Sequence, residues 1–182
     1  MATDFLAQLD PDFAAVVRQV LAATEAKGIT MRPNSAARSP WEQAKLWRQS
    51  RSTEQIRAAG QQMKDEGAPW LADVLAAVGP QHGDHVTNAL PGKSAHQYRL
   101  AVDCFWLRNG EAEWQDMTGY RIYATQAQSF GLTPGMFWTT FVDPPHLQHG
   151  SMDSLPSHSW AMIDADMYRV WGNTPSGQSS RP

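Results

Sequence analysis

The amino-acid sequence predicts an α+β domain, and three observations support that fold class. Segments with an apolar face at helical spacing, several of them preceded by capping residues, predict helices. An apolar, strand-like segment ends at Asn109-Gly110, a dipeptide that is typical of tight turns between antiparallel strands. The length of 182 residues and the 42% hydrophobic content suit one soluble domain with a sizeable core.

The helices are predicted from their caps and their periodicity. Asp10, followed by a proline, begins the first helix, and Gly28 ends it. Ser39 and Glu42 form a capping box at the start of the second helix, over residues 40–49. Further helices are predicted over residues 53–64, 69–78, 119–131 and 159–171.

Short apolar segments predict the strands. A brief extended segment follows the first helix at residues 29–31. The strand over residues 100–107 turns at Asn109-Gly110 and pairs back through residues 112–114. The apolar run "FWTTFV" and the following "PHLQ" are also predicted to be extended.

The chain is predicted to hold one catalytic domain over residues 1–150 and a C-terminal extension over residues 151–182. The last ten or so residues, "GNTPSGQSSRP", are polar and rich in glycine, serine and proline, so we expect them to be disordered.

Charge and hydropathy exclude several classes of partner. With 15 basic and 18 acidic residues the formal net charge is -3, which argues against nucleic-acid binding and against attachment to an anionic membrane surface. The apolar runs near the N-terminus are too short for a signal peptide, and none approaches the roughly 20 residues that span a bilayer. We therefore expect no membrane insertion and synthesis in the cytoplasm. The single cysteine, Cys104, excludes an intramolecular disulfide, and its apolar neighbours predict a buried structural thiol.

The run "SAHQYRLAVD" places His96 and Asp103 at the two ends of a strand-like segment. A charged residue in such a run is costly unless it is paired, so Asp103 is either a hydrogen-bonded buried carboxylate or a metal ligand. Downstream, "FVDPPHLQ" offers His146 and, three residues earlier, Asp143. Catalytic zinc takes three imidazole or carboxylate ligands, and a carboxylate beside the activated water serves as general base. These residues indicate a candidate centre for metal-assisted hydrolysis.

Four blocks in the same order make the sequence similar to a known family. The blocks are "SAARSPWEQ", then "SAHQYRLAVD" preceded by "VTNALPGKS", then Gly131-Leu132 followed by Trp138, and finally "DPPH". The sequence resembles the zinc D,D-carboxypeptidase and L-alanyl-D-glutamate endopeptidase family of bacteria and phages, the VanY-like peptidases, over about residues 10–150. A lone histidine and aspartate at this spacing would indicate little, whereas four blocks in order are specific.

The resemblance implies a role for each matched residue. One zinc ion would be bound by His96, Asp103 and His146. Asp143 would be the general base, and Arg38 would direct its guanidinium at the substrate carbonyl or carboxylate, where a fixed cation stabilises an oxyanion.

The resemblance also implies substrate-binding or supporting roles for Gln43 and Ser94, and it places Trp138 near the cleft. Several positions depart from the family pattern, and residues 36–37, which replace its Gly-Tyr, are among them. Arg99 stands where the family has glycine, which would be costly if that position needs a positive φ, and Leu147 replaces the usual phenylalanine after the last histidine.

Other interpretations remain open for individual residues. Asp143 can cap the turn formed by the two prolines after it, and Arg38 can be a surface residue beside a helix start. His82 and His85 are more typical of a solvated loop than of a second metal site. The eight tryptophans are expected mainly in the core rather than in sugar stacking.

The fold that we expect is a small central antiparallel sheet with the zinc site on one face, flanked by helices. The expected function is hydrolysis of peptide bonds in the stem peptides of bacterial peptidoglycan, with an endolysin-like L-Ala–D-Glu endopeptidase as the first choice. A D-Ala–D-Ala carboxypeptidase is the alternative enzyme, and a non-catalytic cell-wall-binding module on the same fold is the alternative of another class. We expect a monomer that acts on the cell wall after release through a holin or another export route.

Overall fold

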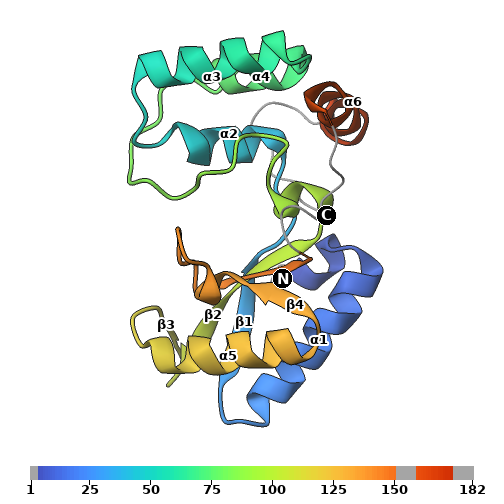
Figure 1. Cartoon of the computed structure of the whole chain (residues 1–182). Helices are drawn as coiled ribbons and strands as arrows, with labels where there is room; N and C mark the ends of the chain where they lie inside the picture. Colours follow the sequence, from blue (N-terminus) through green and yellow to red (C-terminus); the bar gives the residue numbers. More distant parts are fainter. Residues whose placement is uncertain (1–3, 151–158, 174–182) are drawn as a thin grey trace. The chain divides into compact units, whose positions relative to one another are not determined.

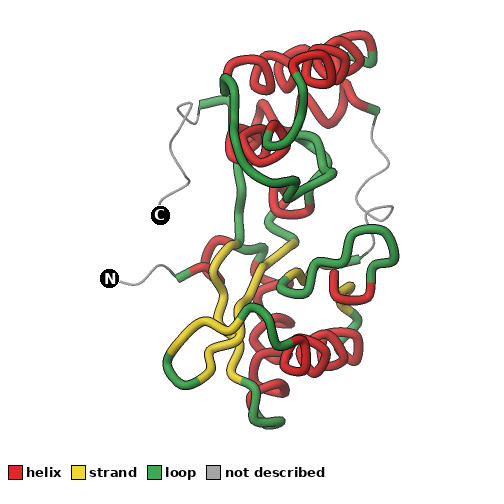
Figure 2. Tube along the Cα trace, turned by 90° about the vertical axis from the view of Figure 1, so that its left-hand side faces the viewer, coloured by secondary structure: helices red, strands yellow, loops and turns green. Residues whose placement is uncertain are grey.

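The computed structural model describes residues 4–150 and 159–173. The contacts between residues divide the described chain into two compact units. Unit 1 holds residues 4–37 and 98–150, and unit 2 holds residues 38–97 and 159–173. Figure 2 shows the strands in unit 1, whereas unit 2 is built from helices and loops.

Unit 1 is built on an antiparallel sheet. Its strands are β1 (Thr30–Ser35), β2 (Ala101–Arg108), β3 (Glu111–Glu113), β4 (Leu132–Pro134) and β5 (His146–His149). The order across the described sheet is β1-β2-β5-β4, and β3 pairs with β2 as the second arm of a hairpin. Every pair is antiparallel, which confirms the predicted fold class and the predicted central sheet.

Helices α1 (Pro11–Glu25) and α5 (Met117–Ser129) pack with the sheet around one apolar core (Figure 1). In β2 the side chains of Val102, Cys104 and Trp106 are buried in this core, while Asp103 and Phe105 alternate with them and are half-buried. Because successive side chains of a strand point to opposite faces, this pattern places Asp103 on the face away from the core. A short 3-10 helix, η1 (Phe5–Gln8), precedes α1.

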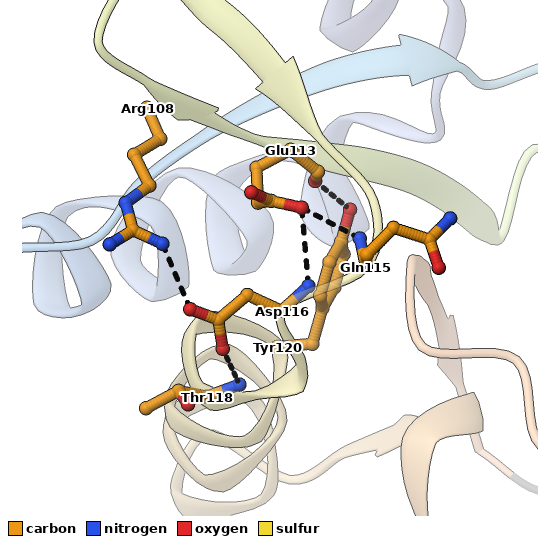
Figure 3. A network of polar contacts seen from close by, with 6 residues as sticks. All are labelled: Arg108, Glu113, Gln115, Asp116, Thr118 and Tyr120. Atoms are coloured by element: carbon orange, nitrogen blue, oxygen red, sulfur yellow. Dashed lines mark hydrogen bonds and ion pairs between the residues drawn. The ribbon is translucent and has the colours of Figure 1, made fainter.

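A network of polar contacts joins the β2–β3 hairpin to the start of α5 (Figure 3). The Glu113 carboxylate accepts hydrogen bonds from the backbone N–H groups of Gln115 and Asp116. Asp116 then caps α5 and accepts a hydrogen bond from Arg108 at 2.9 Å. The Tyr120 hydroxyl donates to the carbonyl of Glu113 at 2.8 Å. These contacts fix the end of β2 that lies away from Asp103, so the network supports the strand and takes no part in the candidate site.

Unit 2 contains α2 (Pro40–Arg48), α3 (Thr53–Asp65), α4 (Pro69–Ala77) and α6 (Trp160–Trp171). The N-cap position of α4 is Ala68, which offers no side-chain hydrogen bond. Asp164 of α6 takes over this function, since its carboxylate accepts from the N–H groups of Leu71 at 2.7 Å and Trp70 at 3.3 Å. The C-terminal helix therefore satisfies the first turn of α4, as an N-cap residue would.

The predicted helices are confirmed, with ends that differ from the predictions by at most a few residues. The capping box of Ser39 and Glu42 forms in both directions, and Ser159 caps α6. The hairpin turn also forms at Asn109-Gly110, where both residues have positive φ.

The prediction of an extended "FWTTFV" segment is wrong. Phe137 ends a 3-10 helix, η3 (Gly135–Phe137), and residues 138–143 form a loop. Phe137 and Val142 are 40% and 55% exposed, so the apolar side chains of this run are not held in a core as those of a strand would be. The strand of this region is instead the short β4, directly before η3.

Within residues 4–150 and 159–173, every helix is too short or too polar to cross a lipid bilayer. The expected disorder of the C-terminal segment falls mainly on residues 174–182, which lie outside the described residues, and the expected division of the chain at residue 150 stays a prediction.

Candidate metal centre

Two of the predicted metal ligands stand opposite each other on paired strands. Asp103 of β2 is the register partner of His146 of β5, so their side chains share one face of the sheet. The His146 Nδ1 atom lies 3.0 Å from the Asp103 Oδ1 atom. Between the buried core residues Val102 and Cys104, Asp103 faces the other way and keeps a partly exposed carboxylate.

The third predicted ligand, His96, stands on a short 3-10 helix, η2 (Ala95–Tyr98). The side-chain oxygen of the next residue, Gln97, accepts hydrogen bonds from the backbone N–H groups of Gly92 at 2.8 Å and Ser94 at 3.3 Å. The indole N–H of Trp171, in α6, donates to the Gln97 carbonyl at 3.3 Å. The Gln97 side chain and the Trp171 indole thus hold the turn that carries His96.

The ligand atoms of His96, Asp103 and His146 all lie within 4.8 Å of one another. Two imidazoles and one carboxylate form a donor set that suits zinc, and three protein ligands are the number that a catalytic zinc site uses. Both histidines are buried, at 2% and 6% exposure, which favours a fixed geometry. This group can hold one metal ion, and among the described residues it is the one cluster of at least three such side chains that can do so.

The electrostatics at His146 favour a positive charge. Burial lowers the pKa of the imidazole, but the hydrogen bond with Asp103 and the charges of Asp103 and Asp143 outweigh burial and raise the pKa above its ordinary value. The same carboxylates that favour a proton on this ring would favour a divalent cation beside it.

The predicted general base, Asp143, is held in a tight loop next to His146. The N–H of Asp143 donates to the Gly135 carbonyl at 3.0 Å, and the N–H of His146 donates to the Asp143 carbonyl at 3.2 Å. A Cβ atom at position 135 would meet the Asp143 carbonyl oxygen at 2.5 Å, so only glycine permits this approach. The Trp138 ring packs on the His146 ring, with centroids 5.0 Å apart, and the Pro145 carbonyl accepts a hydrogen bond from β2.

The predicted residues of the upstream block lie together in unit 2. Arg38 donates to the Gln43 side-chain oxygen at 3.2 Å, and its backbone N–H donates to the His96 carbonyl at 3.3 Å. Gln43 is fully buried, and its amide nitrogen donates to the Ala89 carbonyl at 2.7 Å. Ser94 is buried where the chain enters η2. The structure therefore places Arg38 and Gln43 as a bonded pair next to the backbone of His96.

Arg99 adopts a φ of +62°, the left-handed conformation that favours glycine. It turns the chain from η2 into β2, and its carbonyl accepts a hydrogen bond from the N–H of Asp10 at 3.0 Å. The position that departs from the family pattern is thus one where arginine is strained, at a cost of about 1 kcal/mol.

Cys104 follows Asp103 in β2 but points into the core, where it is fully buried, as the sequence predicts. Burial raises the pKa of its thiol to about 12; contact with the Tyr123 hydroxyl lowers the pKa, and the charge of Asp103 raises it further. The thiol therefore stays protonated and is not a ligand on the face that Asp103 and His146 share.

Sequence reasoning overlooked Gln148, Gly135 and Trp171. Gln148 is 1% exposed and lies 3.0 Å from the His146 Nε2 atom through its side-chain oxygen. Its position two residues after His146 in a predicted strand was a usable signal, because such residues share a face. No local pattern indicates that Gly135 or Trp171 supports the loops of two ligands.

Comparison with known proteins identifies a family whose model matches the sequence. The family model of D-alanyl-D-alanine carboxypeptidase, VanY, matches residues 6–137, a range that contains His96 and Asp103 and ends before Asp143 and His146. No curated protein matches by sequence.

Several solved structures are similar to the chain. The L-Ala D-Glu endopeptidase ChiX of Serratia marcescens has 20% identity and a TM-score of 0.47, over 82% of this chain and 86% of that one. A vancomycin-resistance D,D-pentapeptidase VanY variant in complex with Zn(II) has 20% identity and a TM-score of 0.47, over 80% and 75%. An L,D-carboxypeptidase DacB from Streptococcus pneumonia has 17% identity and a TM-score of 0.43, over 93% and 79%. Because the family model covers most of the sequence, the chain belongs to the VanY family of D-alanyl-D-alanine carboxypeptidases, which are peptidases.

Proposed function

We propose that the chain is a zinc-dependent endopeptidase that cleaves the L-Ala–D-Glu bond in the stem peptides of bacterial peptidoglycan. The observation that carries the proposal is the group formed by His96, Asp103 and His146, whose ligand atoms lie within 4.8 Å of one another in a chain of a peptidase family. A zinc ion bound there supplies Lewis acidity, which polarises the scissile carbonyl and activates the attacking water.

The proposal gives Asp143 the role of general base. Its carboxylate takes a proton from the attacking water and returns it to the nitrogen of the leaving amine. The support for this role is the fixed loop between Gly135 and His146, together with the effect of the Asp143 charge on the pKa of His146.

Arg38 is proposed to stabilise the oxygen on which negative charge develops. A guanidinium offers N–H donors in a rigid plane and keeps its charge at every relevant pH. Its hydrogen bond to the buried Gln43 restrains the side chain, which lowers the entropy lost when substrate binds. In this proposal Gln43 and Ser94 support the site and Trp138 lines it beside His146.

A D-Ala–D-Ala carboxypeptidase is the second candidate, because the matching family model carries that description. The two activities share the metal and the base and differ in the substrate's end. A carboxypeptidase must bind a free terminal carboxylate, whereas an endopeptidase must let the peptide continue past the cleaved bond.

The test is a digest of purified peptidoglycan by the zinc-loaded protein, with and without a chelator, read by mass spectrometry. New L-Ala C-termini and D-Glu N-termini that chelation abolishes and added zinc restores are the expected result. Release of free D-Ala would replace the endopeptidase with the carboxypeptidase. No product from any wall type, with zinc bound, would favour the non-catalytic wall-binding module.

A matched pair of variants tests the general base. Asp143→Asn should lower turnover by about 10²–10⁴-fold, because the amide cannot accept the proton, while zinc binding and fold are kept. Asp65→Asn removes one negative charge from the exposed end of α3 and should leave turnover unchanged. Equal turnover in the two variants would contradict the role of Asp143.

A further inference from the structure

Gln148 is a buried polar residue beside the metal centre, with no role assigned so far. It follows His146 by two residues in β5, and the two side chains share a face of the sheet. Its register partner on β2 is Ala101. Gln148 is 1% exposed, so its polar atoms depend on partners within the protein.

The two hydrogen bonds of the Gln148 amide fix its orientation. The nitrogen lies 3.0 Å from the carbonyl oxygen of Gly150, and a carbonyl oxygen can only accept. The amide nitrogen must therefore face Gly150. This leaves the amide oxygen to face the His146 Nε2 atom, at 3.0 Å.

The orientation of the amide determines the state of the imidazole. An amide oxygen is an acceptor, so the His146 Nε2 atom carries the hydrogen in this contact. With one hydrogen on Nε2, the atom that faces Asp103 is Nδ1, 3.0 Å from the carboxylate: a second proton there makes the hydrogen bond of the imidazolium, and a metal ion that replaces this proton would meet the lone pair of the neutral ring. Nδ1 is the ring atom that faces another candidate ligand.

We propose that Gln148 is a positioning residue, which holds His146 in the tautomer and ring orientation that make Nδ1 its metal-binding atom. The inference rests on the proposed zinc site and not on the bond that the enzyme cleaves. The Gly150 carbonyl holds the amide, the amide holds the imidazole, and the Trp138 ring packs on the imidazole. Removing such a partner of a metal-binding histidine weakens metal affinity by about 10–100-fold.

The experiment compares zinc affinity in two variants by competition with a chromophoric chelator. Gln148→Met keeps the length of the side chain and removes both hydrogen bonds, and we expect zinc binding to weaken by about 10–100-fold. Thr24→Val removes a buried hydrogen bond in α1, from the Thr24 hydroxyl to the Val20 carbonyl, and should leave zinc affinity unchanged. Equal affinity in Gln148→Met and the wild type would overturn the proposal.

A second measurement does not depend on the folding of a variant. The ring nitrogens of His146 in the ¹⁵N-labelled wild type, read by NMR, should show a hydrogen on Nε2 and zinc on Nδ1. A spectrum with the hydrogen on Nδ1 and the metal on Nε2 would overturn the assignment.

Both readouts need no substrate, so they separate this inference from the proposed activity. A wild type that cleaves no wall peptide but gives these results would remove the activity and keep the role of Gln148. A wild type that binds no zinc would remove the proposed site and this inference with it.

Discussion

Asp103 and His146 stand on paired strands, whereas His96 stands on a four-residue 3-10 helix. The distance between the strand-borne ligands follows from the register of β2 and β5, which backbone hydrogen bonds maintain whatever the side chains are. The turn that carries His96 is held by the side chains of Gln97 and Trp171. We therefore expect the strand-borne pair to tolerate changes in distant side chains, and the turn-borne ligand to depend on them.

The largest expected effect concerns the loop that leads into His146, where Gly135 packs closely against Asp143. Gly135→Ala places a Cβ against the Asp143 carbonyl and should lower the free energy of unfolding by about 2–3 kcal/mol. Zinc affinity should fall as well, because the loop leads into His146. Gly60→Ala in α3, where a Cβ meets nothing within 4 Å, should instead stabilise the protein by about 0.5–1 kcal/mol. Urea unfolding and chelator competition measure both effects, and an unchanged Gly135→Ala protein would contradict the argument.

Loss of the cap that α6 provides should affect the helical unit alone. Asp164→Ala leaves the N–H groups of Trp70 and Leu71 without their acceptor, at a cost of about 2 kcal/mol. Hydrogen exchange should accelerate in α4 and stay unchanged in β2 and β5. The control is Asp166→Ala, which removes an exposed ion pair with Arg169 on the same helix and should change little. Faster exchange in the strands would break the comparison between the two regions.

The link between α6 and the His96 turn depends on the indole N–H of Trp171. Trp171→Phe deletes this donor to the Gln97 carbonyl and also shortens a buried side chain, which together should cost about 2 kcal/mol of stability. Zinc affinity should fall by about tenfold, because the turn is less well held. Trp160→Phe at the start of the same helix should leave the affinity as it is. An affinity in Trp171→Phe equal to that of the wild type would show that the turn holds His96 without this contact.

The smallest expected effect concerns Arg99, which stands between the turn that carries His96 and the strand that carries Asp103. Arg99→Gly relieves a positive φ at the entry to β2 and should raise the free energy of unfolding by about 0.5–1 kcal/mol. Asn109→Gly, at a φ of +54° in the hairpin, should change stability less, since asparagine tolerates this conformation. The measurement is the midpoint of urea unfolding for each variant. A destabilised Arg99→Gly protein would mean that the arginine side chain contributes more stability than its backbone strain costs.

Sequence reasoning succeeded where the deciding signal is local. The capping box at Ser39 and the turn at Asn109 each depend on residues a few positions apart, so their patterns are visible in the chain. It failed for "FWTTFV", because the apolar character of Phe137 and Val142 predicts burial only if something covers them, and both are exposed.

The candidate metal ligands were predicted because they belong to sequence motifs. The residues that hold the neighbouring elements in place were not predicted. The contact of Gln97 with Trp171 spans 74 residues, and that of Asp164 with Leu71 spans 93. Such pairs follow from tertiary packing, which no local spacing encodes. Gln148 combines the two kinds of signal. Its position two residues after His146 can be read from the local sequence, but the orientation of its amide depends on the folded chain.

The inward direction of Cys104 has a consequence for the choice of metal ion. A thiolate on the open face of β2 would attract soft ions such as cadmium or mercury, which bind sulfur more strongly than zinc does. The pleat of the strand places the only sulfhydryl of the chain in the core, and a pKa of about 12 keeps it protonated there. The centre is therefore left with nitrogen and oxygen donors, and the buried, protonated thiol is poorly placed to form intermolecular disulfides or sulfenic acid.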